Sequence, residues 1–175
     1  MAERAPTVRL RPVDDAVLAE MVRAALGDAA PDEVTPMLTP GNTWTPERVE
    51  WLTRFHADRR AGLDGPAGEA TWAVEVDGDV AGAVRLKRTA EPGVLETGIW
   101  LARGVRGRGA GRRAIAAVLA QAAVLGGREV RVETGRGNQG ALAILRGLGF
   151  ECSDAGGDRV AARRAVPGTT RAPGR

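Results

Sequence analysis

The chain has 175 residues, enough for one domain that buries about two thirds of the surface its unfolded form exposes. Its formal net charge is +3 and Lys87 is its one lysine, so the sequence pI of 10.2 reflects a preference for arginine. Acidic and basic residues are interspersed, which argues against nucleic-acid binding. No apolar run has the length of a membrane helix, the start lacks the apolar core of a signal peptide, and the single Cys152 excludes an internal disulfide. We therefore expect a soluble cytoplasmic protein without a membrane or nucleic-acid partner.

An alternating segment near the N-terminus predicts the first strand. It covers residues 8–11 and ends at Pro12, and residues 1–6 ahead of it are expected to be a loose end. A helix capped by Asp14 or Asp15 follows. Its apolar positions recur at helical spacing: Leu18, Met21, Val22, Ala25 and Leu26.

Residues 27–43 carry prolines and acids without periodicity, so we expect a loop there. The sequence Thr45-Pro46-Glu47 then begins a second helix, because it offers a hydroxyl cap, a proline in the first turn and an acid near the helix dipole. This helix directs Val49, Leu52 and Phe55 inward and ends before the glycine-containing loop 62–68.

Three strands and two strand–helix units complete the chain. Strands 71–76 and 80–86 flank Asp77-Gly78, a strong hairpin signal, and a further strand covers 94–101. A glycine-rich turn leads into a helix with Ile115, Val118, Leu119 and Ala122 on its buried face. The remaining expected segments are strand 129–133, a helix capped by Asn138 with Leu142, Leu145 and Leu148 inside, an extended segment that begins at Phe150-Glu151-Cys152, and a disordered tail at 166–175.

The glycine-rich turn, Arg106 to Gly111, predicts an anion site. Glycines at a strand-to-helix turn let backbone N–H groups point into one small volume, and the helix N-terminus adds the positive end of its dipole. The arginines in and after the turn, which include Arg108, Arg112 and Arg113, add charge that suits a pyrophosphate or a ribose phosphate.

Two other phosphate motifs fit this turn less well. A dinucleotide-binding turn needs a third glycine where the chain has Arg112, although Glu133 sits at about the distance of a ribose-binding acid. That fold also begins with a βαβ unit, whereas here antiparallel strands come first. A P-loop is excluded because no Gly-Lys-Ser/Thr follows.

Four features together match a known family in order and spacing. They are the opening residues 8–15, the strand residues 96–101, the turn Arg106 to Gly111 as a Q/R-x-x-G-x-G/A signature, and Asn138 with Ala141, closing on Gly149-Phe150. Over residues 7–160 the chain resembles the GNAT family of N-acetyltransferases. Within that family it is similar to the branch of ribosomal-protein alanine N-acetyltransferases.

The resemblance implies an α/β (α+β) fold over a single acyl-CoA N-acyltransferase domain, residues 7–165. Its sheet would be mixed and mostly antiparallel, with six to seven strands, four flanking helices and a splayed central strand pair. Acetyl-CoA would be the co-substrate, without a metal, and a primary amine would attack it directly in a ternary complex. The amine could belong to a protein N-terminus, an amino acid, a small amine or an antibiotic, and a homodimer stays open. A non-catalytic acyl-CoA sensor or interaction module of the same fold is the alternative.

The family's cofactor contacts transfer to positions that match its motifs. Strand residues would contact pantetheine, the turn would bind the pyrophosphate, and Asn138 would lie near the thioester. The implied set is Ile99, Trp100, Leu101, Arg106, Gly107, Arg108, Gly109, Ala110, Gly111, Arg112 and Asn138. Gly109 and Gly111 are expected to keep Cβ atoms away from the phosphate oxygens.

Glu96 is the candidate general base, since an apolar run surrounds it and burial would raise its pKa. The alternative is that Glu96 is a solvated or ion-paired carboxylate without a catalytic role.

Trp44 is the candidate acceptor contact because its loop lies where the family builds the acceptor site. We expect His56 to be a surface or packing residue rather than a catalytic one, and Cys152 to be a small buried residue rather than a site of covalent acetylation. Many relatives place a tyrosine that protonates the leaving sulfur where this chain has Leu145, and the chain contains no tyrosine, so that role does not transfer.

Overall fold

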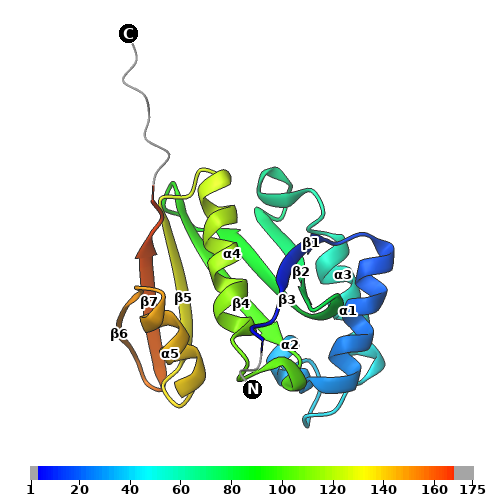
Figure 1. Cartoon of the computed structure of the whole chain (residues 1–175). Helices are drawn as coiled ribbons and strands as arrows, with labels where there is room; N and C mark the ends of the chain where they lie inside the picture. Colours follow the sequence, from blue (N-terminus) through cyan, green and yellow to red (C-terminus); the bar gives the residue numbers. More distant parts are fainter. Residues whose placement is uncertain (1–3, 168–175) are drawn as a thin grey trace.

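A seven-stranded sheet organises the protein, whose computed structural model describes residues 4–167 (Figure 1). The strand order is β1-β2-β3-β4-β5-β7-β6, and only β4 and β5 are parallel neighbours. The strands are β1 (Val8–Pro12), β2 (Glu69–Val76), β3 (Asp79–Arg88), β4 (Val94–Leu101), β5 (Glu129–Gly135), β6 (Glu151–Gly156) and β7 (Arg159–Ala165). This is the mixed, mostly antiparallel sheet expected from the sequence.

Helices pack against the sheet and create two apolar clusters. They are α1 (Asp15–Asp28), α2 (Pro31–Val34), α3 (Pro46–Ala57), α4 (Ala110–Val124) and α5 (Gln139–Gly147). The larger cluster lies between the central strands and α4, with Val118 and Leu86 fully buried. The smaller one joins α1 to β2 and β3 through Met21 and Ala73. No helix within residues 4–167 has the length and apolarity needed to cross a membrane.

Local signals that determine the helix starts are confirmed. The Asp14 carboxylate accepts a hydrogen bond from the Val17 amide at 2.8 Å, and Thr45 accepts one from the Arg48 amide. Asn138 likewise caps α5, with its side-chain oxygen 3.1 Å from the Ala141 nitrogen. These caps satisfy backbone donors that the first helical turn leaves free.

Two elements differ from the sequence-based expectation. The predicted loop 27–43 contains the four-residue helix α2, which Pro31 begins and which Glu33 stabilises by accepting a hydrogen bond from the Ala30 amide. Such a short helix has no apolar periodicity to reveal it. The segment after α5 forms the hairpin β6–β7 rather than one extended stretch; β6 is almost entirely exposed, so it lacks the usual alternation.

The predicted loose ends fall mostly on residues 1–3 and 168–175, which lie outside the described residues. Val166, expected to be in the tail, is instead buried in the larger cluster, and its amide donates to the Arg128 carbonyl at 2.8 Å. The folded domain therefore extends at least one residue past 165.

The splayed central pair is confirmed by the sheet register. Strands β4 and β5 pair only where Val94–Glu96 meets Glu129–Arg131. Beyond this point β5 continues alongside β7, whereas within residues 4–167 no strand pairs with residues 97–101 of β4 on that side. The backbone edge of β4 is therefore open where the cavity described next begins.

Candidate active site

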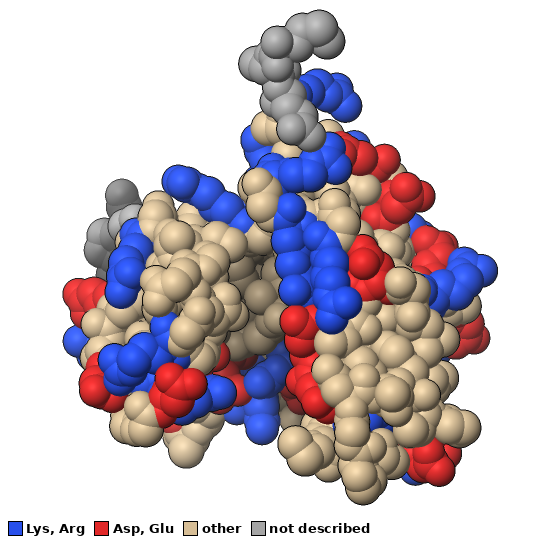
Figure 2. Space-filling view, turned by 90° about the horizontal axis from the view of Figure 1, so that it is seen from below, with Lys and Arg blue, Asp and Glu red and all other residues tan. Residues whose placement is uncertain are grey.

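The splay opens onto a cavity of about 710 Å³ between the end of β4 and the first turns of α4 and α5, here called the β4–α4 cavity. Figure 2 views the molecule from below and shows a hollow between its two halves, with Lys and Arg side chains along one rim. Nine of the eleven predicted cofactor residues line the cavity: Ile99, Trp100, Leu101, Arg106, Gly107, Gly109, Gly111, Arg112 and Asn138. Of the other two, Arg108 is exposed and Ala110 is buried beneath the turn.

Two glycines of the turn adopt a backbone that other residues rarely reach. Gly107 has φ +74° and Gly109, the residue before α4, has φ +87°. A Cβ at either position would meet no atom within 4 Å, so the space outside them is open. No acidic side chain occupies the first turn of α4 and none caps it. The amides at this helix start are thus available to an anion.

Gly111 lines the β4–α4 cavity at a point where two neighbouring side chains come close. A Cβ there would lie 3.0 Å from Ile144 Cδ1 and 3.6 Å from Leu101 Cδ1. The missing side chain therefore allows α4 and α5 to approach each other.

Arg106 is already engaged by the protein. Its guanidinium donates to the Leu101 carbonyl at 3.0 and 2.7 Å and to both oxygens of Glu33 at 3.2 and 2.9 Å. The Arg106 hydrogen bond is the main reason that the pKa of the Glu33 carboxyl lies below its usual range. Arg106 thus ties the turn to the end of β4 and to α2, which the sequence did not indicate.

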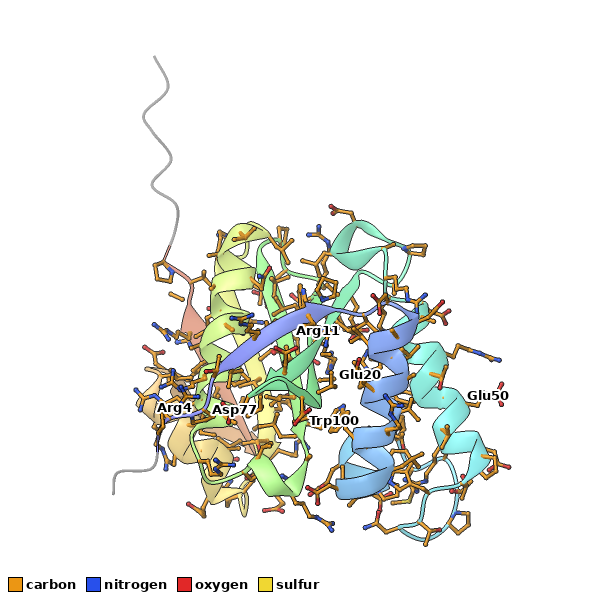
Figure 3. All side chains as sticks on the ribbon, turned by 45° about the vertical axis from the view of Figure 1, so that its right-hand side comes forward. Arg4, Arg11, Glu20, Glu50, Asp77 and Trp100 are labelled. Carbon is orange, nitrogen blue, oxygen red and sulfur yellow. The ribbon has the colours of Figure 1, made fainter. Side chains whose placement is uncertain are left out.

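A second cavity of about 410 Å³, here called the α3 cavity, adjoins the first. Strands β3 and β4 form its floor, and α2 and α3 form its wall. The two cavities share Glu33, Ile99 and Trp100. Figure 3 shows Trp100 in the space between the sheet and α1, and it packs against the smaller apolar cluster.

Aromatic side chains of α3 line one wall of the α3 cavity. The rings of Trp51 and Phe55 stack with centroids 4.8 Å apart, and the Arg59 guanidinium lies 3.6 Å from the Phe55 centroid. The sequence predicted Phe55 as an inward position of this helix but gave no signal that the ring borders a cavity.

An ion-pair network crosses the floor of the α3 cavity. The buried Glu69 accepts hydrogen bonds from Arg59 and, at 3.1 Å, from Arg85. Arg85 extends across Gly98 and donates to Glu96 at 2.7 Å; a Cβ on Gly98 would lie 3.0 Å from Arg85 Nε. The sequence carries no signal for Glu69, Arg59 and Arg85, because the register between β2 and β3 and the packing of the turn after α3 bring them together.

Glu96 is not buried as predicted. Its side chain is 45% exposed and borders a third cavity of about 570 Å³ over β5, β6 and β7, rather than the α3 cavity. The pleat explains this, since Leu95 and Thr97 point into the core and Glu96 points to the opposite face. Glu96 is thus a half-exposed carboxylate that forms an ion pair with Arg85.

Trp44 also lies elsewhere than expected. Its indole nitrogen donates to the Ala29 carbonyl at 3.0 Å, which fixes the ring at the end of α1. The residues that line the α3 cavity come from α2, α3 and the sheet, without Trp44.

Cys152 is half-buried beside the third cavity. Within residues 4–167 no group of His, Cys, Asp and Glu is arranged to hold a metal.

His56 is a buried residue that lines the α3 cavity, so of the two expected positions, surface or packed, it takes the packed one. Its Nδ1 lies 3.0 Å from the Thr71 hydroxyl, and burial, together with the charge of Arg59, lowers its pKa to about 4. Because the folded protein prefers the neutral ring, the full stabilisation is present above pH 6.5 and is lost as the pH falls towards 4. We expect the free energy of unfolding to fall by about 3 kcal/mol over that range from this group alone.

Urea unfolding of the wild type and of His56→Gln, measured at several pH values between 8 and 5, checks this expectation. The variant should lose most of the pH dependence above pH 5, where carboxylates contribute little. Equal slopes in both proteins would show that His56 does not control acid stability.

Comparison with known proteins agrees with this geometry. The model of the acetyltransferase (GNAT) domain family matches residues 7–151. No curated protein matches the chain by sequence.

Solved structures with the same fold include RimJ from Mycobacterium smegmatis in complex with CoA-disulfide, with a TM-score of 0.71 and 18% identity over 90% of this chain and 81% of that one. RimL, a ribosomal L7/L12 alpha-N-protein acetyltransferase in complex with coenzyme A, has a TM-score of 0.69 and 16% identity, covering 91% and 94%. A phosphinothricin acetyltransferase from Sinorhizobium meliloti in complex with acetyl-CoA gives 0.64 and 22%, covering 98% and 94%. The expected family is confirmed: the chain belongs to the GNAT acetyltransferases.

Proposed function

We propose that this protein transfers the acetyl group of acetyl-CoA to a primary amine, which attacks the thioester directly in a ternary complex. The observation that carries this proposal is the junction of the β4–α4 and α3 cavities at Glu33, Ile99 and Trp100. A donor in the first cavity and an acceptor in the second would meet there, and holding both reactants in place supplies much of the catalysis.

The open edge of β4 and the turn suit the two ends of the cofactor. Residues 97–101 offer unpaired backbone groups along which a pantetheine arm can add like a strand. The amides at Gly109 and the start of α4 would bind the pyrophosphate, with Arg108 and Arg112 near it. The side-chain nitrogen of Asn138 has no hydrogen bond among the described residues and can donate to the arm. Arg106 would contribute by holding the shape of the turn.

The chemistry requires loss of a proton from the acceptor, because an amine is an ammonium ion at neutral pH. We assign this proton to Glu96 through a chain of waters, because Glu96 lies four residues along β4 from Trp100 at the junction. Glu96 Oε1 accepts from Arg85, whereas Oε2 has no partner within the described residues. The free amine would then attack the carbonyl carbon, the C–S bond would break, and CoA would leave as a thiolate. Leu145 is buried where relatives carry an acid, and a thiol with a pKa of about 8.5 leaves without one.

Gly109→Val provides the first test, because its Cβ would project into the open space where the phosphates are expected. We expect the variant to lose the micromolar-range affinity for acetyl-CoA that the wild type should show in calorimetry. Gly126→Val is the matched control, since Gly126 at the other end of α4 also has a positive φ and open space around it. Each change should cost about 1–2 kcal/mol of stability through backbone strain.

Thiol release with a panel of amines then separates enzyme from sensor. Unchanged acetyl-CoA binding in Gly109→Val would remove the basis for the cofactor placement. Wild-type binding without turnover of any amine would instead support a non-catalytic acyl-CoA sensor.

A further inference from the structure

We infer that the acceptor carries a carboxylate several atoms away from its reactive amine, and that Lys87 binds this carboxylate. The inference rests on the proposed function, since it takes the junction of the two cavities as the place where the amine meets the thioester. It gives the opposite end of the α3 cavity a role, namely to bind the carboxylate of the acceptor.

The sheet register gives the α3 cavity a direction. Across β3 and β4, Trp100 pairs with Ala83 at the junction, Gly98 pairs with Arg85, and Glu96 pairs with Lys87. Lys87 therefore lies four residues along β3 from the junction, about 13 Å at ~3.3 Å per residue. Its four-carbon stem can bring the ammonium part of the way back. An acceptor that spans both ends must therefore be longer than an α-amino acid.

Charge is unbalanced only at this distant end. Of the two acidic side chains that line the α3 cavity, Glu33 is paired with Arg106 and Glu69 with Arg59 and Arg85. His56 is neutral above its pKa of about 4. The exposed Lys87 is the one lining charge without an ion pair among residues 4–167.

The lack of a partner for Lys87 is unusual for its position. It lies directly across from Glu69 on β2 and from Glu96 on β4, the pairings that normally form cross-strand ion pairs. Instead, Arg85 donates a hydrogen bond to one oxygen of each of these two carboxylates. The carboxylates are thereby neutralised and the ammonium stays available, which favours an anionic group on the ligand.

The middle of the α3 cavity suits an apolar connection between the two ends. Its wall there is formed by the stacked rings of Trp51 and Phe55 and by Leu52. A volume of about 410 Å³ accommodates an ω-amino acid or the first residues of a peptide. Both sources offer the same chemistry, namely an amine, a short apolar body and a carboxylate.

Initial rates of thiol release test the inference with matched acceptors. We expect ω-aminohexanoate to exceed its methyl ester in kcat/KM by roughly tenfold, through KM, and added salt to reduce the difference. C-terminally amidated Ala-Glu-Ala and Ala-Gln-Ala form the second pair. Preference for the acid in only one pair identifies the source, a free amino carboxylate or a peptide.

Variants assign the preference to Lys87. Lys87→Met should abolish it, Lys87→Arg should retain it, and Arg23→Met, which removes an exposed charge from α1, should leave it unchanged. Equal kcat/KM for acid and neutral partners in both pairs would overturn the inference while leaving amine acetylation established. A preference that survives in Lys87→Met, or acetylation of Lys87 itself in the intact mass, would also overturn it. Absence of turnover with every amine would be a failure of the proposed function, not of the carboxylate assignment.

Discussion

Replacing Arg48 by methionine is expected to lower the free energy of unfolding by about 3–5 kcal/mol, as for other buried charges removed from their partners. Arg48 is fully buried on α3, and each of its five N–H donors is used. Nε donates to the Thr39 hydroxyl, Nη1 to Asp32 and the Thr35 hydroxyl, and Nη2 to the carbonyls of Thr39 and Gly41. Methionine fills a similar volume but leaves these acceptors without donors.

Urea unfolding measures the effect, with Arg54→Met as the control. Arg54 lies on the same helix, but its side chain is 70% exposed and pairs only with Glu50, so the control should change stability by less than about 0.5 kcal/mol. Arg48→Lys should also be destabilised, because an ammonium cannot serve all five acceptors. Similar midpoints for Arg48→Met and Arg54→Met would show that the network contributes little.

The same network has a consequence for the site. Arg48 holds Asp32 of α2, and the neighbouring Glu33 holds Arg106 of the glycine turn. A chain of ion pairs on adjacent residues therefore connects the wall of the α3 cavity to the turn. Loss of Arg48 should raise the KM for the amine even under conditions in which the variant stays folded.

Features determined by nearby residues could be predicted from the sequence. Asp77 and Gly78 both have positive φ, as their hairpin turn requires, and the turn joins β2 to β3 as expected. Gly107 and Gly109 have the left-handed backbone typical of an anion-binding turn. Asn138 caps its helix because the cap depends on residues only three positions apart.

Features that depend on strand register or on contacts between distant residues could not be predicted from the sequence. Arg48 reads as an ordinary surface arginine on a helix, since its partners lie in a loop without a pattern. Glu69 directly follows a glycine, and its burial depends on Arg59 from the turn after α3 and on Arg85 from β3. The apolar neighbours of Glu96 suggested burial, but alternation along β4 places its side chain on the less covered face. Most of the lining of the β4–α4 cavity was thus predictable from the sequence, whereas the lining of the α3 cavity was not.

Glu96→Gln is expected to lower turnover by roughly 10²- to 10⁴-fold while leaving acetyl-CoA affinity nearly unchanged. Glutamine keeps the shape of the side chain and can still accept from Arg85, but it cannot take a proton from the attacking amine. The loss should be greatest at low pH, where the free amine is scarcest, and wild-type activity should rise with pH to a plateau determined by amine deprotonation. Steady-state rates across the pH range, with calorimetry for the cofactor, measure both quantities.

The matched control is Glu133→Gln, which removes a carboxylate from the same third cavity, where Glu133 is 59% exposed and pairs with Arg159. It should keep wild-type rates, because its carboxylate lies on β5, pairs with Arg159 and does not contact Arg85 or β4. If Glu96→Gln also kept wild-type rates at every pH, Glu96 would serve only to hold Arg85, and the acceptor's proton would leave directly to water. If both variants lost activity equally, the cause would be the charge of the cavity and not proton transfer by one residue.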